Sequence, residues 1–242
     1  MTPFLQALSF LTVLRVPASV VAKPPGPWTA VWFPVIGALL GGALGALLAI
    51  LRLGFPPLVA AGLTVAVWVL ATGAIHLDGL IDCADALPGL RTPEERMRIL
   101  KDPTVGAYGV AAGACGVLLK IASTAAAPVW APVLAASLGR WACLVAMVSQ
   151  PYHGRDGQGT GSTLTLGLGG RHLLAGSLVP AGIALAAGWV GVAMLAAAAL
   201  AALGFARLAA HRLPAATGDV YGAIIETAEI ATLCLSSTPP LP

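Results

Sequence analysis

Three aspartates, Asp78, Asp82 and Asp85, lie in the segment A-I-H-L-D-G-L-I-D-C-A-D at residues 74–85, directly after a long apolar run. On an α-helix this spacing places all three side chains within a wedge of about 60° on one face. Carboxylates so close together repel one another unless a cation neutralises them. Ligand sets made of oxygen alone favour Mg²⁺ or Mn²⁺ over zinc. The spacing therefore predicts a Mg²⁺ site on this helix.

The next segment, E-R-M-R-I-L-K-D-P-T-V-G-A-Y-G-V at residues 95–110, supplies positive charge and flexible backbone. Thr92 and Pro93 predict the start of a short helix, because threonine caps a helix and proline suits its first position. Pro103 is expected to end that helix, and Gly106 then lets a backbone amide approach a ligand closely. The basic residues here are Arg96, Arg98 and Lys101. They either hold a phosphate or simply solvate a cytoplasmic turn.

Charges inside apolar runs form a further set of candidates. Arg140 normally needs a partner in the bundle, because an unpaired charge in lipid is costly. That partner is either a neighbouring acid such as Glu226 or the substrate itself, and Lys120 pairs or snorkels in the same way. The glycine-rich segment 151–162, which contains Arg155, is either a substrate-binding loop or a linker.

The last apolar run opens with T-G-D-V-Y-G-A-I-I-E-T-A-E at residues 217–229. Asp219 and Glu226 fall on one helical face, and Glu229 lies about 60° further round. We expect these acids to face a polar cavity, where Asp219 and Glu226 complete the metal shell or Glu229 binds the intramembrane arginine. His76 lies on the side of its helix opposite the aspartates, so we expect it to orient another group by a hydrogen bond rather than to act as the base.

Composition places the chain in a membrane. Hydrophobic residues make up 58% of its 242 residues, charged residues only 10%, and the mean hydropathy is +0.89, whereas soluble domains carry about 25% charged residues. The apolar runs are rich in alanine, leucine, valine and glycine, which favours helices over an outer-membrane barrel. The expected fold is all-α, a single polytopic helical bundle over residues 1–242. Its seven expected transmembrane helices lie near 29–51, 58–75, 109–127, 133–150, 173–188, 189–210 and 219–236.

The flanking segments predict how the bundle sits in the bilayer. The stretch before Pro17 is too short to span and lacks a signal-peptide pattern, so we expect an N-terminal interfacial or re-entrant helix. Basic residues gather on one side and leave only Arg52 on the other, which predicts that the N-terminus and the arginine-rich loops face the cytoplasm and that the C-terminus is outside. The ridge of Gly37, Gly41 and Gly45 predicts a close helix contact, within the chain or between subunits of a homo-oligomer.

Acids for a metal, bases for phosphate and glycine amides together suit phosphoryl transfer, where positioning and charge neutralisation do most of the catalysis. The metal would bridge phosphate oxygens while basic residues hold a pyrophosphate. An aspartate would take the proton from an attacking hydroxyl. We expect small-molecule substrates and no nucleic-acid partner.

The same residues resemble a known family. The blocks H-L-D-G-L-I-D-C-A-D-A-L at 76–87, E-R-M-R-I-L-K-D-P-T-V-G-A-Y-G-V at 95–110 and T-G-D-V-Y-G-A at 217–223 are similar to those of the cobalamin-5′-phosphate synthase family, the adenosylcobinamide-GDP ribazoletransferases. Weaker support comes from F-L-T-V-L-R-V-P at 10–17 and G-R-W at 139–141. The resemblance implies a multi-pass enzyme of the bacterial inner membrane that depends on Mg²⁺. It would join adenosylcobinamide-GDP to α-ribazole or its 5′-phosphate and release GMP.

Carried onto the matching positions, the resemblance makes Asp82 the first candidate for the essential catalytic acid, with Asp78 beside it. The candidate metal ligands are Asp78, Asp82, Asp85 and Asp219. The candidate substrate or phosphate contacts are Arg15, Arg96, Lys101, Asp102, Gly106, Arg140, Arg155 and Glu226.

Three alternatives fit the sequence less well. A CDP-alcohol phosphotransferase pairs D-G with a following A-R and ends in two aspartates four residues apart, and this chain has Asp78-Gly79 without the A-R. A transporter needs polar groups through both halves of its path, and here the outer half has almost none. A purely structural membrane anchor leaves the acids clustered at 78–85 unexplained.

Overall fold

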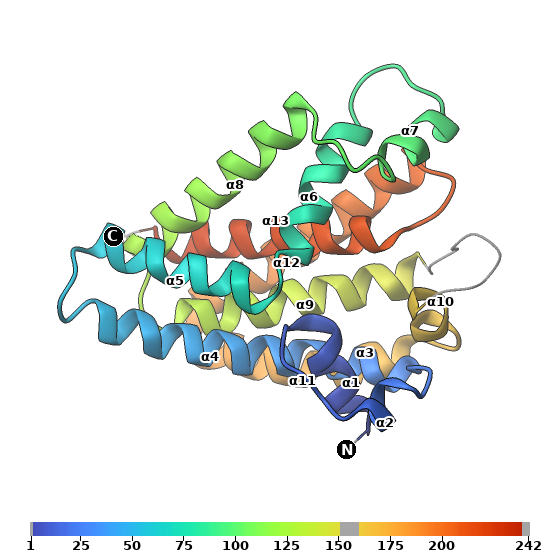
Figure 1. Ribbon diagram of the computed structural model, residues 1–242. Coiled ribbons are helices and arrows are strands. Elements are labelled where there is room, and N and C mark those ends of the chain that lie inside the picture. The colour runs from blue at the N-terminus through green and yellow to red at the C-terminus, as the bar shows by residue number, and fades with distance from the viewer. Residues whose placement is uncertain (1, 151–159, 239–242) are drawn as a thin grey trace.

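The computed structural model describes residues 2–150 and 160–238, and every regular element within these ranges is a helix, which confirms the all-α prediction. Figure 1 shows α4, α9, α12 and α13 side by side along the molecule, with α7 and α10 at one end. The helices are α1 (Thr2–Leu11), α2 (Ala18–Val21), α3 (Pro27–Val31), α4 (Phe33–Leu51), α5 (Pro57–Ala71), α6 (Ile75–Ala86), α7 (Pro93–Ile99), α8 (Ala107–Ala126), α9 (Ala131–Ser149), α10 (Thr160–Thr165), α11 (Gly170–Ala186), α12 (Gly188–Arg212) and α13 (Gly218–Ser236).

Each of the seven predicted apolar ranges contains a helix, but the predicted count of seven spans is not confirmed. Four stretches of the described chain are long and apolar enough to cross a membrane, namely Pro27–Leu51, α8, α9 and α12. α5 and α6 add a fifth only if they form one broken span. α5 has 15 residues and α11 has 17, short of the roughly 20 that a span needs. α13 carries three acids within its 19 residues.

α9 forms the centre of the bundle, and most of its side chains are buried. It packs on α4 through the predicted glycine ridge. A Cβ added at Gly37, Gly41 or Gly45 would lie 2.3, 2.2 or 2.4 Å from a backbone oxygen of α9 or of the turn before it. Only glycine permits this approach, so the ridge makes a helix contact within the chain.

Replacing Gly41 by alanine should destabilise the protein, because the added methyl group would meet the Pro132 carbonyl oxygen at 2.2 Å. Overpacking of this kind costs about 1–3 kcal/mol. Gly42→Ala is the matched control, since a Cβ there meets nothing within 4 Å and alanine favours the helix. Thermal unfolding in detergent should give a lower Tm for Gly41→Ala and an unchanged or slightly higher Tm for Gly42→Ala. Equal Tm values would contradict the contact.

A bend of 88° separates α5 from α6. Gly73 (φ +62°) and Ala74 (φ +59°) both adopt the left-handed conformation at the bend. Glycine accepts this conformation freely, whereas alanine is strained there by about 1–2 kcal/mol. The turn is closed by a hydrogen bond from the Ala74 N–H to the Val69 carbonyl at 2.9 Å. The bend turns the aspartate-bearing helix away from the axis of α5, so other contacts must hold α6 in place.

α1 has ten residues, which is too short to span a bilayer, as predicted. The side chain of Gln6 ties this helix to the segment that follows. Its Nε2 donates to the Lys23 carbonyl at 2.8 Å, and the Thr29 hydroxyl donates to its Oε1 at 3.1 Å. These bonds fold α1 back beside α3, next to the start of α4.

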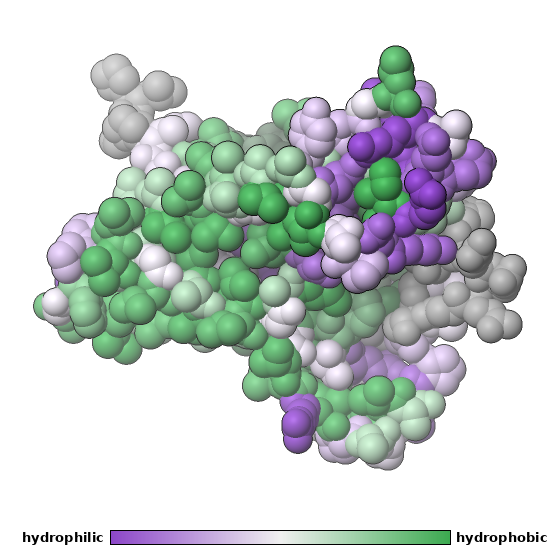
Figure 2. All heavy atoms as spheres, turned by 45° about the horizontal axis from the view of Figure 1, so that its top comes forward, coloured by the Kyte–Doolittle hydropathy of each residue, from purple (hydrophilic) through white to green (hydrophobic). Residues whose placement is uncertain are grey.

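The two ends of the molecule differ in polarity. Hydrophilic residues gather around α7 and the adjoining end of α6, whereas hydrophobic residues cover most of the remaining visible face (Figure 2). The end of α13 lies at the opposite end from α7 (Figure 1). Arg52 lies at that opposite end, where its Nη2 donates to the carbonyls of Thr124, Ala125 and Ala127 at 2.8–3.0 Å and caps α8.

Candidate functional site

α6 carries the three predicted aspartates at the polar end of the bundle. Asp78 is exposed, and Asp82 and Asp85 are half-buried. Asp82 lies within electrostatic reach of the other two and of Asp219 on α13. The structure therefore brings the four predicted metal ligands into one region.

Two glycines make this arrangement possible. A Cβ on Gly79 would lie 2.6 Å from the backbone oxygen of Asp219, and a Cβ on Gly222 would lie 3.2 Å from the backbone oxygen of Ile75. The backbones of α6 and α13 therefore touch where they cross. Because Asp78 directly precedes Gly79, this contact sets its carboxylate beside the first turn of α13.

Asp85 has a different role from its neighbours. Its carboxylate accepts the backbone N–H groups of Gly106 at 2.7 Å and Gly109 at 2.8 Å. An acid in this position caps α8 and offsets the positive end of the helix dipole. The Gly106 amide that we expected to approach a phosphate thus donates to Asp85. Among the described residues, no hydrogen bond is made to the carboxylates of Asp78 and Asp82.

Arg96 holds the C-terminal end of α6. α7 begins after Thr92, as the sequence predicts, and Glu95 completes a capping box with Thr92. Arg96 follows in the interior, 3% exposed. Its guanidinium donates to the backbone carbonyls of residues 86, 87, 88 and 89. Arg212 also donates to the Leu87 carbonyl, at 3.2 Å. In this structure Arg96 binds backbone rather than presenting its charge to a phosphate.

Loss of the Arg96 side chain should therefore destabilise the fold. Arg96→Ala removes charged hydrogen bonds, each worth about 1.5–3 kcal/mol, and Arg96→Lys should restore only part of the loss because lysine lacks the forked guanidinium. Arg98→Ala is the control, since Arg98 is exposed on the same helix. Thermal unfolding should rank Arg96→Ala well below Arg98→Ala. Weakened substrate binding at an unchanged Tm would contradict this role.

The other predicted phosphate contacts lie at the surface or outside the described residues. Lys101, Asp102 and Arg15 are exposed. The Thr104 hydroxyl and its backbone N–H, the latter at 2.9 Å, donate to Asp102. These bonds lower the pKa of Asp102 below its ordinary value and keep it ionised beside Lys101. Arg155 and most of the glycine-rich segment lie outside the described residues.

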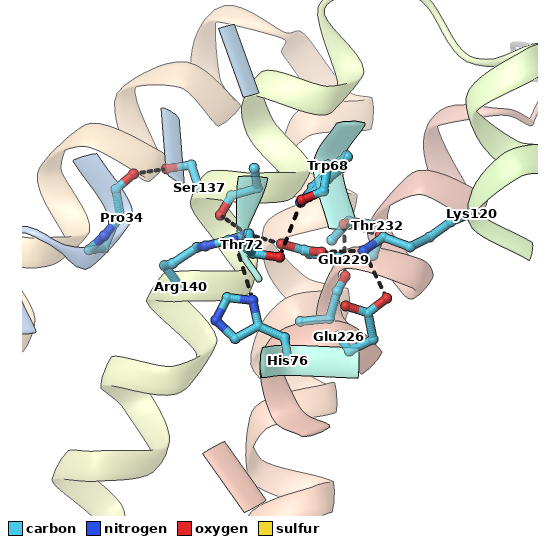
Figure 3. A network of polar contacts seen from close by, with 12 residues as sticks. Pro34, Trp68, Thr72, His76, Lys120, Ser137, Arg140, Glu226, Glu229 and Thr232 are labelled. Carbon is cyan, nitrogen blue, oxygen red and sulfur yellow. Dashed lines mark hydrogen bonds and ion pairs between the residues drawn. The ribbon is translucent and has the colours of Figure 1, made fainter. Parts of the chain in front are cut away.

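A buried ionic network connects the start of α6 with α8, α9 and α13 (Figure 3). Arg140 donates to Glu229, and Lys120 Nζ lies 2.6 Å from Glu229 Oε2 and 2.8 Å from Glu226 Oε1. Arg140 Nη2 also lies 3.4 Å from His76 Nδ1 at the start of α6. These five side chains come from α6, α8, α9 and α13, and each is at most 5% exposed. Two positive and two negative charges balance one another, which buried ions require.

The network decides between the alternatives for these residues. Arg140 does pair with an acid, and of the two acids predicted for it the partner is Glu229. Glu226 pairs with Lys120, which also contacts Glu229. Arg140 and Glu226 thus lie inside the protein and not at a substrate surface. His76 contacts another side chain by a hydrogen bond, as predicted.

A cavity of about 310 Å³ adjoins the aspartates. Asp78 and Asp219 line it together with His76. Apolar side chains from α1, α4, α9, α10 and α13 form much of the remaining lining, among them Phe33 and Met147. The site therefore combines carboxylates with an apolar recess.

The donor set suits a hard divalent cation. In the described part of the chain, no three histidine, cysteine, aspartate or glutamate side chains are gathered closely enough to hold a metal ion alone. Mg²⁺ does not require such a cage, because it keeps several waters and takes one or two carboxylates plus substrate phosphates. Asp78, Asp82 and Asp219 are the candidates for those one or two carboxylates, since none of them joins the ion pairs found within the described ranges.

The fold and the site define a helical membrane protein with an acidic site and an adjoining cavity at its polar end. The chain belongs to the cobalamin-5-phosphate synthase family, whose model matches residues 3–237. This confirms the resemblance carried by the sequence blocks.

Relatives from distant bacteria agree with this assignment. A Deinococcus radiodurans protein named adenosylcobinamide-GDP ribazoletransferase is 37% identical over 233 residues, covering 94% of this chain and 82% of the relative. Proteins of the same name from Pseudomonas syringae pv. syringae (37% identical, covering 96% of this chain and 98% of the relative) and Brevibacillus brevis (34%, covering 96% of each) are also similar. No solved structure matches the chain.

Sequence reasoning missed the glycines of the crossing and the apolar side chains of the cavity. Gly79 and Gly222 each lie within three residues of an aspartate. Small residues on an apolar helix are a recognised signal of close helix packing. The cavity has no comparable signal, because its lining comes from helices far apart in the chain.

Proposed function

We propose that this chain is a Mg²⁺-dependent transferase of a substituted phosphate group, an adenosylcobinamide-GDP ribazoletransferase. It joins adenosylcobinamide-GDP to α-ribazole or α-ribazole 5′-phosphate. The products are adenosylcobalamin or its 5′-phosphate, and GMP. Family membership and the names of the relatives support the activity. The observation that carries the proposal is the α6–α13 crossing, which sets Asp78 beside Asp219 at the edge of a cavity, with Asp82 within electrostatic reach of both.

In the reaction, a ribose hydroxyl of the acceptor attacks the phosphorus that bears the cobinamide arm. A new phosphorus–oxygen bond forms to the acceptor, the bond to the GMP oxygen breaks, and GMP leaves with the electron pair. Asp78 is exposed, lines the cavity and accepts no hydrogen bond within the described chain. We therefore assign it the hydroxyl proton.

Asp82 and Asp219, with Asp78 nearby, would hold Mg²⁺, which supplies charge neutralisation to the diphosphate when bound. In this proposal Asp85 is a positioning residue, because it fixes the start of α8 against α6. Exposed Lys101 and Arg98 at the same polar end offer positive charge to the nucleotide. The excess of arginine in the loops at the polar end supports a cytoplasmic orientation of the site in the inner membrane.

Asp82→Asn should abolish turnover while leaving the fold intact. The amide keeps the shape of the side chain but loses its negative charge, so GMP release should fall by about a hundredfold or more. Glu94→Gln is the control, because Glu94 is an exposed acid on α7 and is not among the candidate metal ligands. Purified protein assayed for GMP release, with thermal unfolding in parallel, makes the comparison. Normal turnover in folded Asp82→Asn would refute the assignment.

Chelation tests the metal separately. EDTA should stop GMP release by the purified enzyme, and added Mg²⁺ in excess should restore it, because the diphosphate's negative charge then has a counterion. Mn²⁺ should support turnover as well, since it accepts the same oxygen ligands. Full turnover in EDTA would rule out the metal model while leaving the transferase activity established.

A further inference from the structure

The cavity beside the aspartates combines two carboxylates with a largely apolar lining. Its volume of about 310 Å³ lies at the lower limit of small-molecule sites, which span roughly 300–1,000 Å³. Asp78 and Asp219 provide carboxylates, and Phe10, Phe33 and Met147 are among its apolar residues. A corrinoid ring with its nucleotide arm is far too large for this space. The cavity therefore suits a compact ligand with an apolar part and a polar part.

We propose that this cavity binds the acceptor nucleoside, with its methylated bicyclic base against the apolar side chains and its ribose directed to Asp78. This assignment rests on the proposed function and names the place of one of its two substrates. The base of α-ribazole is a dimethylbenzimidazole, whose ring edge carries two methyl groups and no N–H donor. Phe10 and Phe33 stack with ring centroids 5.6 Å apart and offer the aromatic surface that such a base packs on.

The guanine of the other substrate fits this lining less well. Its ring edge carries several donors and acceptors, and each is costly to bury without a partner. The hydroxyl of Tyr221, one of the polar groups in the lining, donates to the Gln150 carbonyl at 2.9 Å. Met147, Cys143 and Ile225 add further apolar surface. We therefore assign the GDP end of the donor to the exposed basic residues of the polar end.

The position of the cavity agrees with the chemistry. A nucleoside held there presents its ribose hydroxyl to Asp78 and Asp219, the two aspartates of the lining. The acceptor is thus held on the inner side of the carboxylates, and the larger donor approaches them from the polar surface. This arrangement places the acceptor in the cavity and the donor at the exposed polar surface.

Two cavity variants and one control test the assignment. Met147→Ala removes a wall, and Cys143→Leu fills part of the space; both residues lie on α9 and line the cavity. Leu134→Ala is the control, because Leu134 is buried on α9 about 20 Å along the helix from Met147 and about 13 Å from Cys143. GMP release is measured with adenosylcobinamide-GDP and either α-ribazole or the benzimidazole riboside that lacks both methyl groups.

Wild-type protein should prefer α-ribazole by about tenfold or more in kcat/KM, since each buried methyl group contributes substantially to selectivity. Met147→Ala should raise the KM for α-ribazole at least fivefold and leave the KM for adenosylcobinamide-GDP within twofold. Cys143→Leu should lower the preference for the methylated base at least fivefold. Leu134→Ala should change neither the KM ratio nor the preference.

Equilibrium dialysis of α-ribazole alone provides a readout that needs no turnover. Binding that is tight in wild-type protein and weaker in both cavity variants supports the cavity, even if no GMP is released, in which case the proposed function fails separately. The assignment is overturned if both cavity variants bind and discriminate acceptors like Leu134→Ala. It is also overturned if they raise the KM for adenosylcobinamide-GDP alone, which would place the guanosine in the cavity.

Discussion

The backbones of α6 and α13 touch at Gly79 and Gly222, and the position of the site depends on this contact. α6 leaves α5 at 88° through a strained left-handed turn, so the preceding chain does not fix its direction. The crossing fixes it instead, because any side chain at Gly79 would meet the backbone of Asp219. Arg96 then holds the far end of α6 by its carbonyls, and Asp85 joins it to α8. A short helix is thus immobilised at its middle and at its C-terminal end.

The charged side chains of the bundle interior form ion pairs, whereas the described aspartates of the polar end do not. In the bundle interior Arg140 and Lys120 are matched by Glu226 and Glu229 (Figure 3). Ions buried in this way are tolerated only when they are paired and hydrogen-bonded, and removing one partner is costly. At the polar end Asp78, Asp82 and Asp219 join none of the ion pairs found among the described residues, and the carboxylate of Asp85 is bound by backbone N–H groups only. Repulsion among these carboxylates is the physical reason for proposing a cation there. The interior network links the start of α6 through His76 to the helices that surround it.

The carboxylates and the apolar walls of the site come largely from different helices. α6 and the first turn of α13 bring carboxylates, while α1, α4, α9 and α10 bring apolar walls. A membrane bundle supplies apolar recesses readily, because most of its interior side chains are hydrophobic. Carboxylates at the edge of one recess fit the proposed reaction, in which the nucleoside lies in the cavity and the charged diphosphate stays near the polar surface.

The sequence alone determined what depends on neighbouring residues. Apolar runs predicted where helices form, Thr92 and Pro93 predicted the start of α7, and the spacing of the aspartates predicted a shared helical face. Only the tertiary structure decided the partners: that Glu229 rather than Glu226 pairs with Arg140, that Arg96 holds backbone, and that walls from distant helices enclose a cavity. Propensity and capping act over a few residues along the chain. Partners across helices depend on crossing angles and register, which arise only when the whole bundle packs.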